Sequence, residues 1–123
     1  MKFTADRPEG SYVVRGYAPG RLRIGQREIT TSVILSPATL IEPWRPRRMS
    51  EFTADDLEPA IALSPAVLLI GTGARQVFPD AAVFAALHAA HIGFEIMDTG
   101  AACRTYNVLI GEDRDVAAAL MIE

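Results

Sequence analysis

Short runs rich in β-branched and aromatic residues alternate with turn residues through the first fifty positions. The runs cover residues 12–17, 21–24, 28–29, 32–35 and 39–44. Pro19-Gly20, Gly25 and Ser36-Pro37 separate several of them, and such residues are typical of the turns between antiparallel strands. The pattern predicts short strands over these runs, with a tight hairpin turn at residues 25–27.

Helical and strand patterns alternate after residue 50. Thr53 is placed to cap a helix with acidic residues in its first turn, and Pro65 ends this helix. The uninterrupted apolar run at 66–70 is typical of a strand that is covered on both faces. The first part of this half therefore predicts one helix followed by one buried strand.

The rest of the chain repeats this alternation. Asp80 predicts the start of a helix through His91 that Gly93 ends, and residues 94–97 predict the next strand. Asp98 or Thr99 is expected to cap a third helix that runs to about Ile110. Residues 116–122 are β-branched at their ends and alanine-rich in the middle, which allows a strand or a short helix, and we expect a strand.

This order of elements predicts an α/β fold. Strand, helix, strand, helix, strand implies right-handed crossovers and parallel βαβ units, to which the N-terminal strands add antiparallel members. We expect a single domain over residues 1–123, with a β-rich part over 1–50 and an α/β part over 51–123.

Composition narrows the class of protein. Half of the 123 residues are hydrophobic and 22% are charged, which argues against a disordered chain. A single cysteine excludes an intramolecular disulfide. Residues 1–8 lack the apolar segment of a signal peptide, and the apolar run at 81–87 is too short to cross a bilayer. We therefore expect a cytoplasmic protein without membrane insertion.

Charge divides the chain into two unlike parts. Residues 1–48 hold nine Lys/Arg and four Asp/Glu, whereas residues 49–123 hold three and eleven. Arg45, Arg47 and Arg48 end the basic part, and they form either a surface for an acidic protein partner or an ordinary solvated surface. We do not expect nucleic acid as a partner, because the pI is about 5.4 and aromatic residues do not interleave with the arginines.

A glycine loop follows the apolar strand. Gly71-Thr72-Gly73 stands where a dinucleotide-binding fingerprint would begin, but Gln76 occupies the place of its third glycine. The loop also lacks the Gly-Lys-Ser/Thr of a P-loop. Two interpretations stay open, a tight turn off the sheet or a backbone cradle for a small anion or carbonyl group.

Further polar residues predict a crevice at the carboxyl ends of the parallel strands. Glu95 lies in a strand expected to be covered on both sides, so it either pairs with Arg104 or Arg114 or lines the crevice beside the glycine loop. Thr99, Tyr106 and Asn107 lie along one face of the third helix and either face a ligand or tie the helix to its neighbours. The candidate ligand crevice comprises Gly71, Thr72, Gly73, Glu95, Thr99, Tyr106 and Asn107.

Sequence signals for catalysis are weak. Cys103 lies one turn into a helix and is either a nucleophile whose thiol pKa is lowered by the helix N-terminus or a small buried residue, and no histidine is obviously placed to pair with it. His88 and His91 are three residues apart and could share a metal ion. Two ligands are too few for a metal site unless carboxylates complete the set. We therefore expect no cofactor and no metal. Whether the protein is an enzyme stays open, and the residues favour a protein without catalytic activity.

Four segments occur in one order, namely Gly71–Gly73, Glu95–Thr99, Ala102–Leu109 and Glu112–Leu120. Together they resemble the small domain-of-unknown-function family that includes the mitochondrial respiratory complex I assembly factor three and an adipogenesis-associated protein. The resemblance implies a three-layer fold with a mixed central sheet and an additional antiparallel N-terminal β layer. It implies no established catalytic activity, and a role in helping a membrane complex to assemble.

These observations predict a non-enzymatic protein-interaction or assembly-factor-type module. Its partner is a protein that the sequence does not identify, and the resemblance points to a membrane-complex subunit. The alternative is an enzyme that binds a small molecule or anion in the crevice at Gly71–Gly73, Glu95 and the helix starting near Thr99. The sequence leaves the oligomeric state open.

Overall fold

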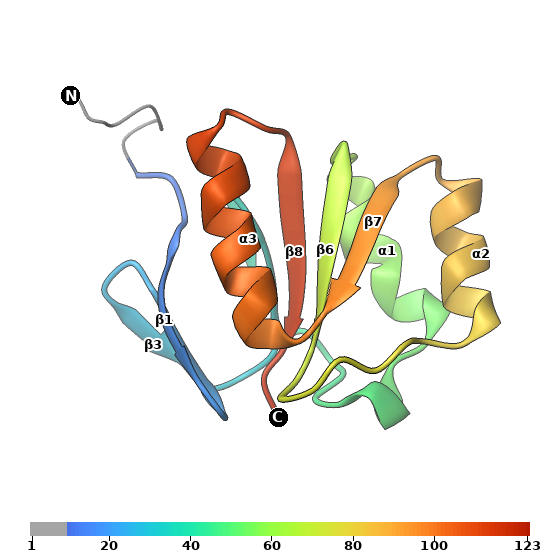
Figure 1. Cartoon of the computed structure of the whole chain (residues 1–123), viewed down its shortest axis with the longest axis horizontal. Coiled ribbons are helices and arrows are strands. Elements are labelled where there is room, and N and C mark those ends of the chain that lie inside the picture. The colour runs from blue at the N-terminus through green and yellow to red at the C-terminus, as the bar shows by residue number, and fades with distance from the viewer. Residues whose placement is uncertain (1–9) are drawn as a thin grey trace.

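Two β-sheets organise the chain, a three-stranded antiparallel sheet and a five-stranded mixed sheet (Figure 1). The computed structural model describes residues 10–123. The stretch at 1–8, considered above for a signal peptide, lies outside the described residues. The predicted α/β fold with a mixed central sheet is confirmed.

The small sheet contains β1 (Val14–Ala18), β2 (Arg21–Ile24) and β3 (Arg27–Ile29), in that order. Its two turns contain Gly20, with φ 84°, and Gly25, with φ 61°. Glycine adopts these left-handed angles without the steric cost of a Cβ atom, which explains why the chain reverses at these points. The predicted hairpin turn thus lies where the sequence placed it, with Arg27 as the first residue of β3.

The central sheet has the strand order β5-β4-β8-β6-β7. Its strands are β4 (Val33–Ser36), β5 (Thr39–Ile41), β6 (Val67–Thr72), β7 (Gly93–Met97) and β8 (Val116–Met121). β6 runs parallel to β7 and β8, whereas β4 runs antiparallel to β5 and β8. The N-terminal strands are therefore divided, because β1 to β3 form a separate layer and β4 and β5 extend the central sheet.

Helices separate and cover these sheets. α3 (Thr99–Gly111) lies between the small sheet and one face of the central sheet, while α1 (Glu58–Ala62) and α2 (Ala81–Ala89) lie on the opposite face (Figure 1). One cluster of buried residues joins the small sheet, α3 and the central sheet, and a second joins the central sheet to α1 and α2. Burial of apolar surface in both clusters stabilises this arrangement.

Helix caps occur where the sequence predicted them. Thr53 and Asp56 form a capping box, although the helix opens with a 3-10 turn (Ala54–Leu57) before α1, and another 3-10 turn (Met49–Glu51) precedes it. Asp80 accepts a hydrogen bond from the Val83 amide at 3.4 Å. Asp98, rather than Thr99, caps α3 by accepting a bond from the Ala101 amide at 2.8 Å.

Two predicted boundaries are wrong. The strand expected over 39–44 ends at Ile41, and Trp44 instead enters the core, where its ring lies 5.6 Å from that of Phe52. The helix expected to run through His91 ends at Ala89, and His91 with φ 58° redirects the chain. Packing of Trp44 overrides the local pattern in the first place, and a left-handed residue does so in the second.

Candidate functional site

The predicted glycine loop is wrong in part, because Gly71 and Thr72 are the last two residues of β6 and Gly73 alone follows the strand. This end of β6, still called the glycine loop below, packs tightly against the start of α3. A Cβ atom added at Gly71 would lie 2.9 Å from the Thr99 hydroxyl oxygen and 3.0 Å from both Thr99 Cα and Leu120 Cδ2. Real Cβ contacts are essentially never that short, so the close approach of β6, β8 and α3 requires glycine here. Gly73 has φ 99°, which also favours glycine.

Thr99 ties this loop to β8. Its buried hydroxyl accepts a hydrogen bond from the Gly73 amide at 2.8 Å and donates one to the Met121 carbonyl. The Thr99 amide donates to the Gly73 carbonyl at 2.8 Å. Two amides that an anion would need, those of Gly73 and Thr99, are therefore already bonded inside the protein.

Thr72 holds the chain that leaves the loop. Its hydroxyl donates to the carbonyl of Arg75 at 2.5 Å and accepts from the amide of Val77 at 3.1 Å. Gln76 then reaches the β7 edge, donating from Nε2 to the Ile96 carbonyl at 2.8 Å. These bonds make residues 72–77 a compact turn above the carboxyl ends of the parallel strands.

Glu95 lies elsewhere, and its expected burial is wrong. β7 is an edge strand, and the Glu95 side chain is exposed on the face that α3 covers mainly over β6 and β8. Within residues 10–123 it makes no hydrogen bond or ion pair with Arg104 or Arg114. Because α3 covers mainly β6 and β8, the Glu95 carboxylate on β7 stays in solvent and needs no partner.

Tyr106 and Asn107 face the N-terminal strands rather than the glycine loop. Asn107 accepts from the Val14 amide at 3.1 Å and donates to the Val14 carbonyl at 2.7 Å. The buried Tyr106 donates from its hydroxyl to the Tyr12 carbonyl at 2.8 Å. Both side chains attach the small sheet to α3, so the structure divides the predicted crevice residues among three places.

Carboxylates of the same chain partly neutralise the charge of the basic segment at residues 45–48. Arg45 donates to both carboxylate oxygens of Asp56, at 2.9 and 2.7 Å, and to the Glu51 carbonyl. This contact, mainly the hydrogen bonds from Arg45, lowers the pKa of Asp56. Arg48 lies 3.4 Å from a Glu123 carboxylate oxygen, whereas the Arg47 side chain has no ion pair within residues 10–123.

A hollow of about 440 Å³ joins this segment to the glycine-loop turn. Arg48, Met49 and Ser50 line one side, and the other side is lined by Thr72, Ala74, Arg75, Val77 and Glu123. Val77 is 40% exposed and Phe78, the next residue, is 66% exposed. We call Arg48, Arg75, Val77 and Phe78 the carboxyl-edge surface, which combines two guanidinium groups with two exposed apolar side chains.

The sequence candidates for catalysis lie in unreactive settings. Burial raises the pKa of the Cys103 thiol to about 12, which keeps it protonated at neutral pH. His88 is exposed and its ring lies 5.5 Å from that of Phe94. Among residues 10–123, no group of three or more His, Cys, Asp or Glu side chains is arranged to hold a metal ion.

A second basic surface was missed by the sequence reasoning. Arg15, Arg21, Arg23 and Arg104 are exposed on or beside the small sheet, yet they are scattered along the chain. Arg21 pairs with Glu28 at 3.2 Å. Side chains two residues apart on a strand lie on the same face of the sheet. This period would have predicted that Arg21 and Arg23 lie side by side.

Comparison with known proteins places this fold in a family. The family described as "Protein of unknown function (DUF498/DUF598)" matches residues 14–121. The chain belongs to this family. Its sequence resemblance to the group that includes the complex I assembly factor is confirmed, since the family and the relatives below agree.

Two relatives and one solved structure illustrate the similarity. The "NADH dehydrogenase (ubiquinone) 1 alpha subcomplex assembly factor 3" of Danio rerio is 35% identical over 112 residues, which cover 89% of this chain and 63% of that protein. The "13 kDa major membrane protein" of Francisella tularensis is 25% identical over 122 residues, covering 98% and 99%. A crystal structure of a Bordetella parapertussis protein shares 35% identity with a TM-score of 0.87, covering 94% and 100%.

These relatives do not assign a location to this chain. It spans less than two thirds of the Danio rerio assembly factor, and another relative is named a membrane protein. Over residues 10–123, the structure has no helix whose length and apolar character would let it span a membrane. A cytoplasmic location therefore stays a prediction.

Proposed function

We propose that this protein is a non-enzymatic interaction module that binds another protein during the assembly of a larger complex. The observation that carries the proposal is the exposure of Phe78 and Val77 beside the hollow that Arg48 and Arg75 line. Aromatic and arginine side chains are enriched at the centres of protein interfaces, where they contribute most of the binding free energy. The name of the Danio rerio relative supports an assembly role.

The carboxyl-edge surface fits a partner segment that carries an apolar side chain next to a carboxylate. The turn held by Thr72 presents Val77 and Phe78 on a fixed backbone, which reduces the entropy lost on binding. Arg75 has no hydrogen bond or ion pair through its side chain within residues 10–123 and is available to an acidic group.

The predicted partner residues contribute unequally to this proposal. Arg45 is held by Asp56, so its replacement would disturb the fold as well as any interface. Arg47 is exposed and unpaired among the described residues, and Arg48 shares its charge with Glu123. Arg48 is therefore part of the carboxyl-edge surface and Arg47 extends it, while Arg45 is held by Asp56 and stabilises this segment.

The internal use of polar groups supports interaction over catalysis. The amides of Gly73 and Thr99 are bonded within the protein, and the Cys103 thiol has a pKa of about 12. Glu95, a carboxylate of the predicted crevice, lies in solvent on the edge strand β7. The other polar side chains of the predicted crevice, those of Thr72, Thr99, Tyr106 and Asn107, bond to the backbone inside the protein, which supports a structural role for them.

Affinity purification with mass spectrometry from the native cell tests the proposal. We expect at least one protein to be recovered with the unmodified chain and lost with Phe78→Ser or Arg75→Glu. Val108→Ser is the matched control, because Val108 is 57% exposed on α3, away from the proposed surface. Equal thermal melts would show that all variants are folded. Recovery of the same partners by every variant would refute the proposal.

A further inference from the structure

Four arginines surround the middle of β1. Arg21 and Arg23 lie on β2, Arg15 lies at an irregularity of the β1–β2 pairing, and Arg104 lies on α3. Glu28 pairs with Arg21 and lies opposite Arg23 across the β2–β3 pairing, and within residues 10–123 the side chains of Arg15, Arg23 and Arg104 make no ion pair. This part of the surface therefore carries uncompensated positive charge, although the whole chain has a net charge of −3.

Three adjoining hollows lie among these arginines. The largest, of about 410 Å³, is lined by Gly16, Tyr17, Ala18, Arg21, Leu22, Arg23 and Glu28. A second, of about 260 Å³, lies between β1 and α3 and includes Gly16, Arg15 and Arg104. The third, of about 290 Å³, includes Arg15 and Arg23. Because they share Gly16, Arg15 and Arg23, the hollows form one indented surface around β1.

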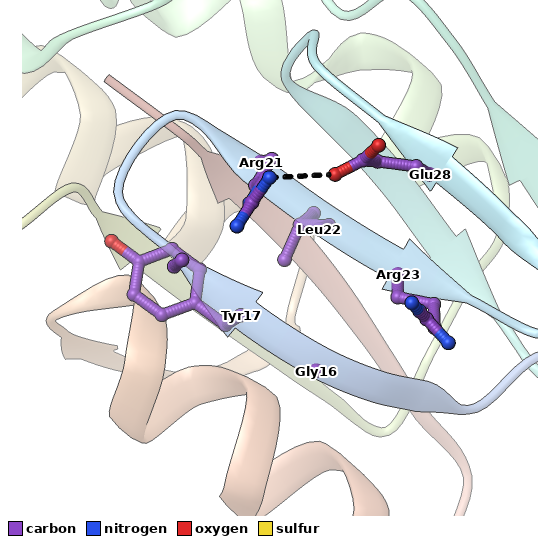
Figure 2. A pocket seen from close by; sticks show the side chains of 7 residues that line it. Gly16, Tyr17, Arg21, Leu22, Arg23 and Glu28 are labelled. Atoms are coloured by element: carbon purple, nitrogen blue, oxygen red, sulfur yellow. Dashed lines mark hydrogen bonds and ion pairs between the residues drawn. The ribbon is translucent and has the colours of Figure 1, made fainter.

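Gly16 leaves this surface open. It lies at the irregularity of the β1–β2 pairing, but neither its backbone angle nor its packing requires glycine there. Its φ is outside the left-handed region, and a Cβ atom added to it would meet nothing within 4 Å. Packing and backbone geometry would therefore both permit a larger residue at this position. Glycine inside a strand also lowers stability. Figure 2 shows bare strand at Gly16, between Tyr17 and Arg23, with Arg21 and Glu28 paired above it.

We infer that Arg15, Gly16, Arg23 and Arg104, here called the Gly16 surface, bind an acidic segment of the protein partner. The inference rests on the proposed function and adds a second contact to it. Guanidinium groups hold carboxylates through paired hydrogen bonds, and the absent side chain at Gly16 lets a partner backbone approach β1 closely. A short acidic segment suits a local basic patch on a protein that is acidic overall.

Binding of fluorescein-labelled decaglutamate to the full chain at low ionic strength tests the inference. We expect the peptide to shift the amide NMR signals of residues 15–28 and 104. Arg23→Glu should weaken binding by about tenfold, because it replaces attraction by repulsion. Gly16→Val should weaken binding as much while leaving the melting temperature unchanged or higher. Arg114→Glu, at an exposed arginine outside both basic surfaces, is the control that retains affinity.

Several results would overturn the inference. Signal shifts confined to residues 45–48 and 75 would place the acidic segment on the other basic surface. Undiminished binding by Gly16→Val would show that Gly16 has no binding role. A lower melting temperature of that variant would show that the fold itself requires glycine there. Equal shifts with inorganic phosphate or a DNA duplex would identify a general anion surface. None of these outcomes depends on Phe78, so each is separate from failure of the proposed function.

Discussion

The glycine loop at the end of β6 and the Gly16 surface on β1 use glycine in opposite ways. At Gly71 an added Cβ atom would lie within 3.0 Å of Thr99 and Leu120, so the fold itself requires the residue. At Gly16 the same atom would meet nothing within 4 Å. A glycine inside a strand is therefore informative about binding when the surrounding structure gives no reason for it.

The polar groups of the two regions differ in the same way. The hydroxyl groups of Thr99 and Thr72 form hydrogen bonds with backbone groups inside the protein. Arg15 and Arg23 face solvent without acidic partners in the described part of the chain. The first region supplies stability, and the second retains unsatisfied charge for a partner.

The largest expected effect comes from adding the same side chain to both regions. Gly71→Val forces Cβ and its methyl groups into Thr99 and Leu120, and we expect a loss of about 3 kcal/mol of unfolding free energy. Gly16→Val adds the same volume in open space and should cost nothing. Urea denaturation of both variants measures this difference in stability. Equal denaturation midpoints would contradict the different roles of the two glycines.

Thr99→Val should have the next largest effect. The substitution keeps the shape of the side chain but leaves the Gly73 amide and the Met121 carbonyl without their buried partner, at a cost of about 2 kcal/mol. Thr31→Val, at an exposed position, is the matched control. A melt of Thr99→Val that coincides with that of the control would show that the hydroxyl does not hold the loop.

Cys103 predicts a loss of stability at high pH. Burial raises the pKa of its thiol from 9.0 to about 12, so the folded state retains a proton that the unfolded state releases. The resulting stability is complete below pH 9 and is lost as the pH rises towards 12, at about 1 kcal/mol per pH unit. Burial also raises the pKa of Tyr17, which adds to the slope. Unfolding free energies between pH 8 and 11 should fall less steeply for Cys103→Ala, and parallel curves would contradict the assignment.

Glu95→Ala should have the smallest effect. Its carboxylate is exposed on β7 and unpaired among residues 10–123, so the free energy of unfolding should change by less than about 0.5 kcal/mol. Asp56→Ala offers a contrast, because it removes both the contact with Arg45 and the capping box. A large loss for Glu95→Ala would mean that the edge strand is covered.

Local signals in the sequence predicted the elements well. Asp80 and Asp98 cap the helices that follow them, and the turn containing Gly20 closes the first hairpin. Each signal acts over a few residues, through a hydrogen bond or a backbone angle that the neighbouring residues determine. The candidate site was harder to predict, since its residues had to be brought together by strand order.

Glu95 and the basic surfaces show where sequence reasoning stopped. A strand pattern does not reveal whether a strand lies at the edge of its sheet, so Glu95 was expected to be buried. Arg45, Arg47 and Arg48 stand out because they are nearly contiguous, whereas Arg15, Arg23 and Arg104 become neighbours only through the packing of β1, β2 and α3.

The sequence by itself determined the alternation of strands and helices, the helix caps, the turns and the membership of the family. Tertiary structure alone decided that Thr99 lies against Gly71, that Asn107 binds Val14, and that Gly16 lies among unpaired arginines. The physical reason is range. Caps and turns depend on interactions within a few residues, while burial, charge pairing and open surface depend on which distant segments the folded core brings into contact.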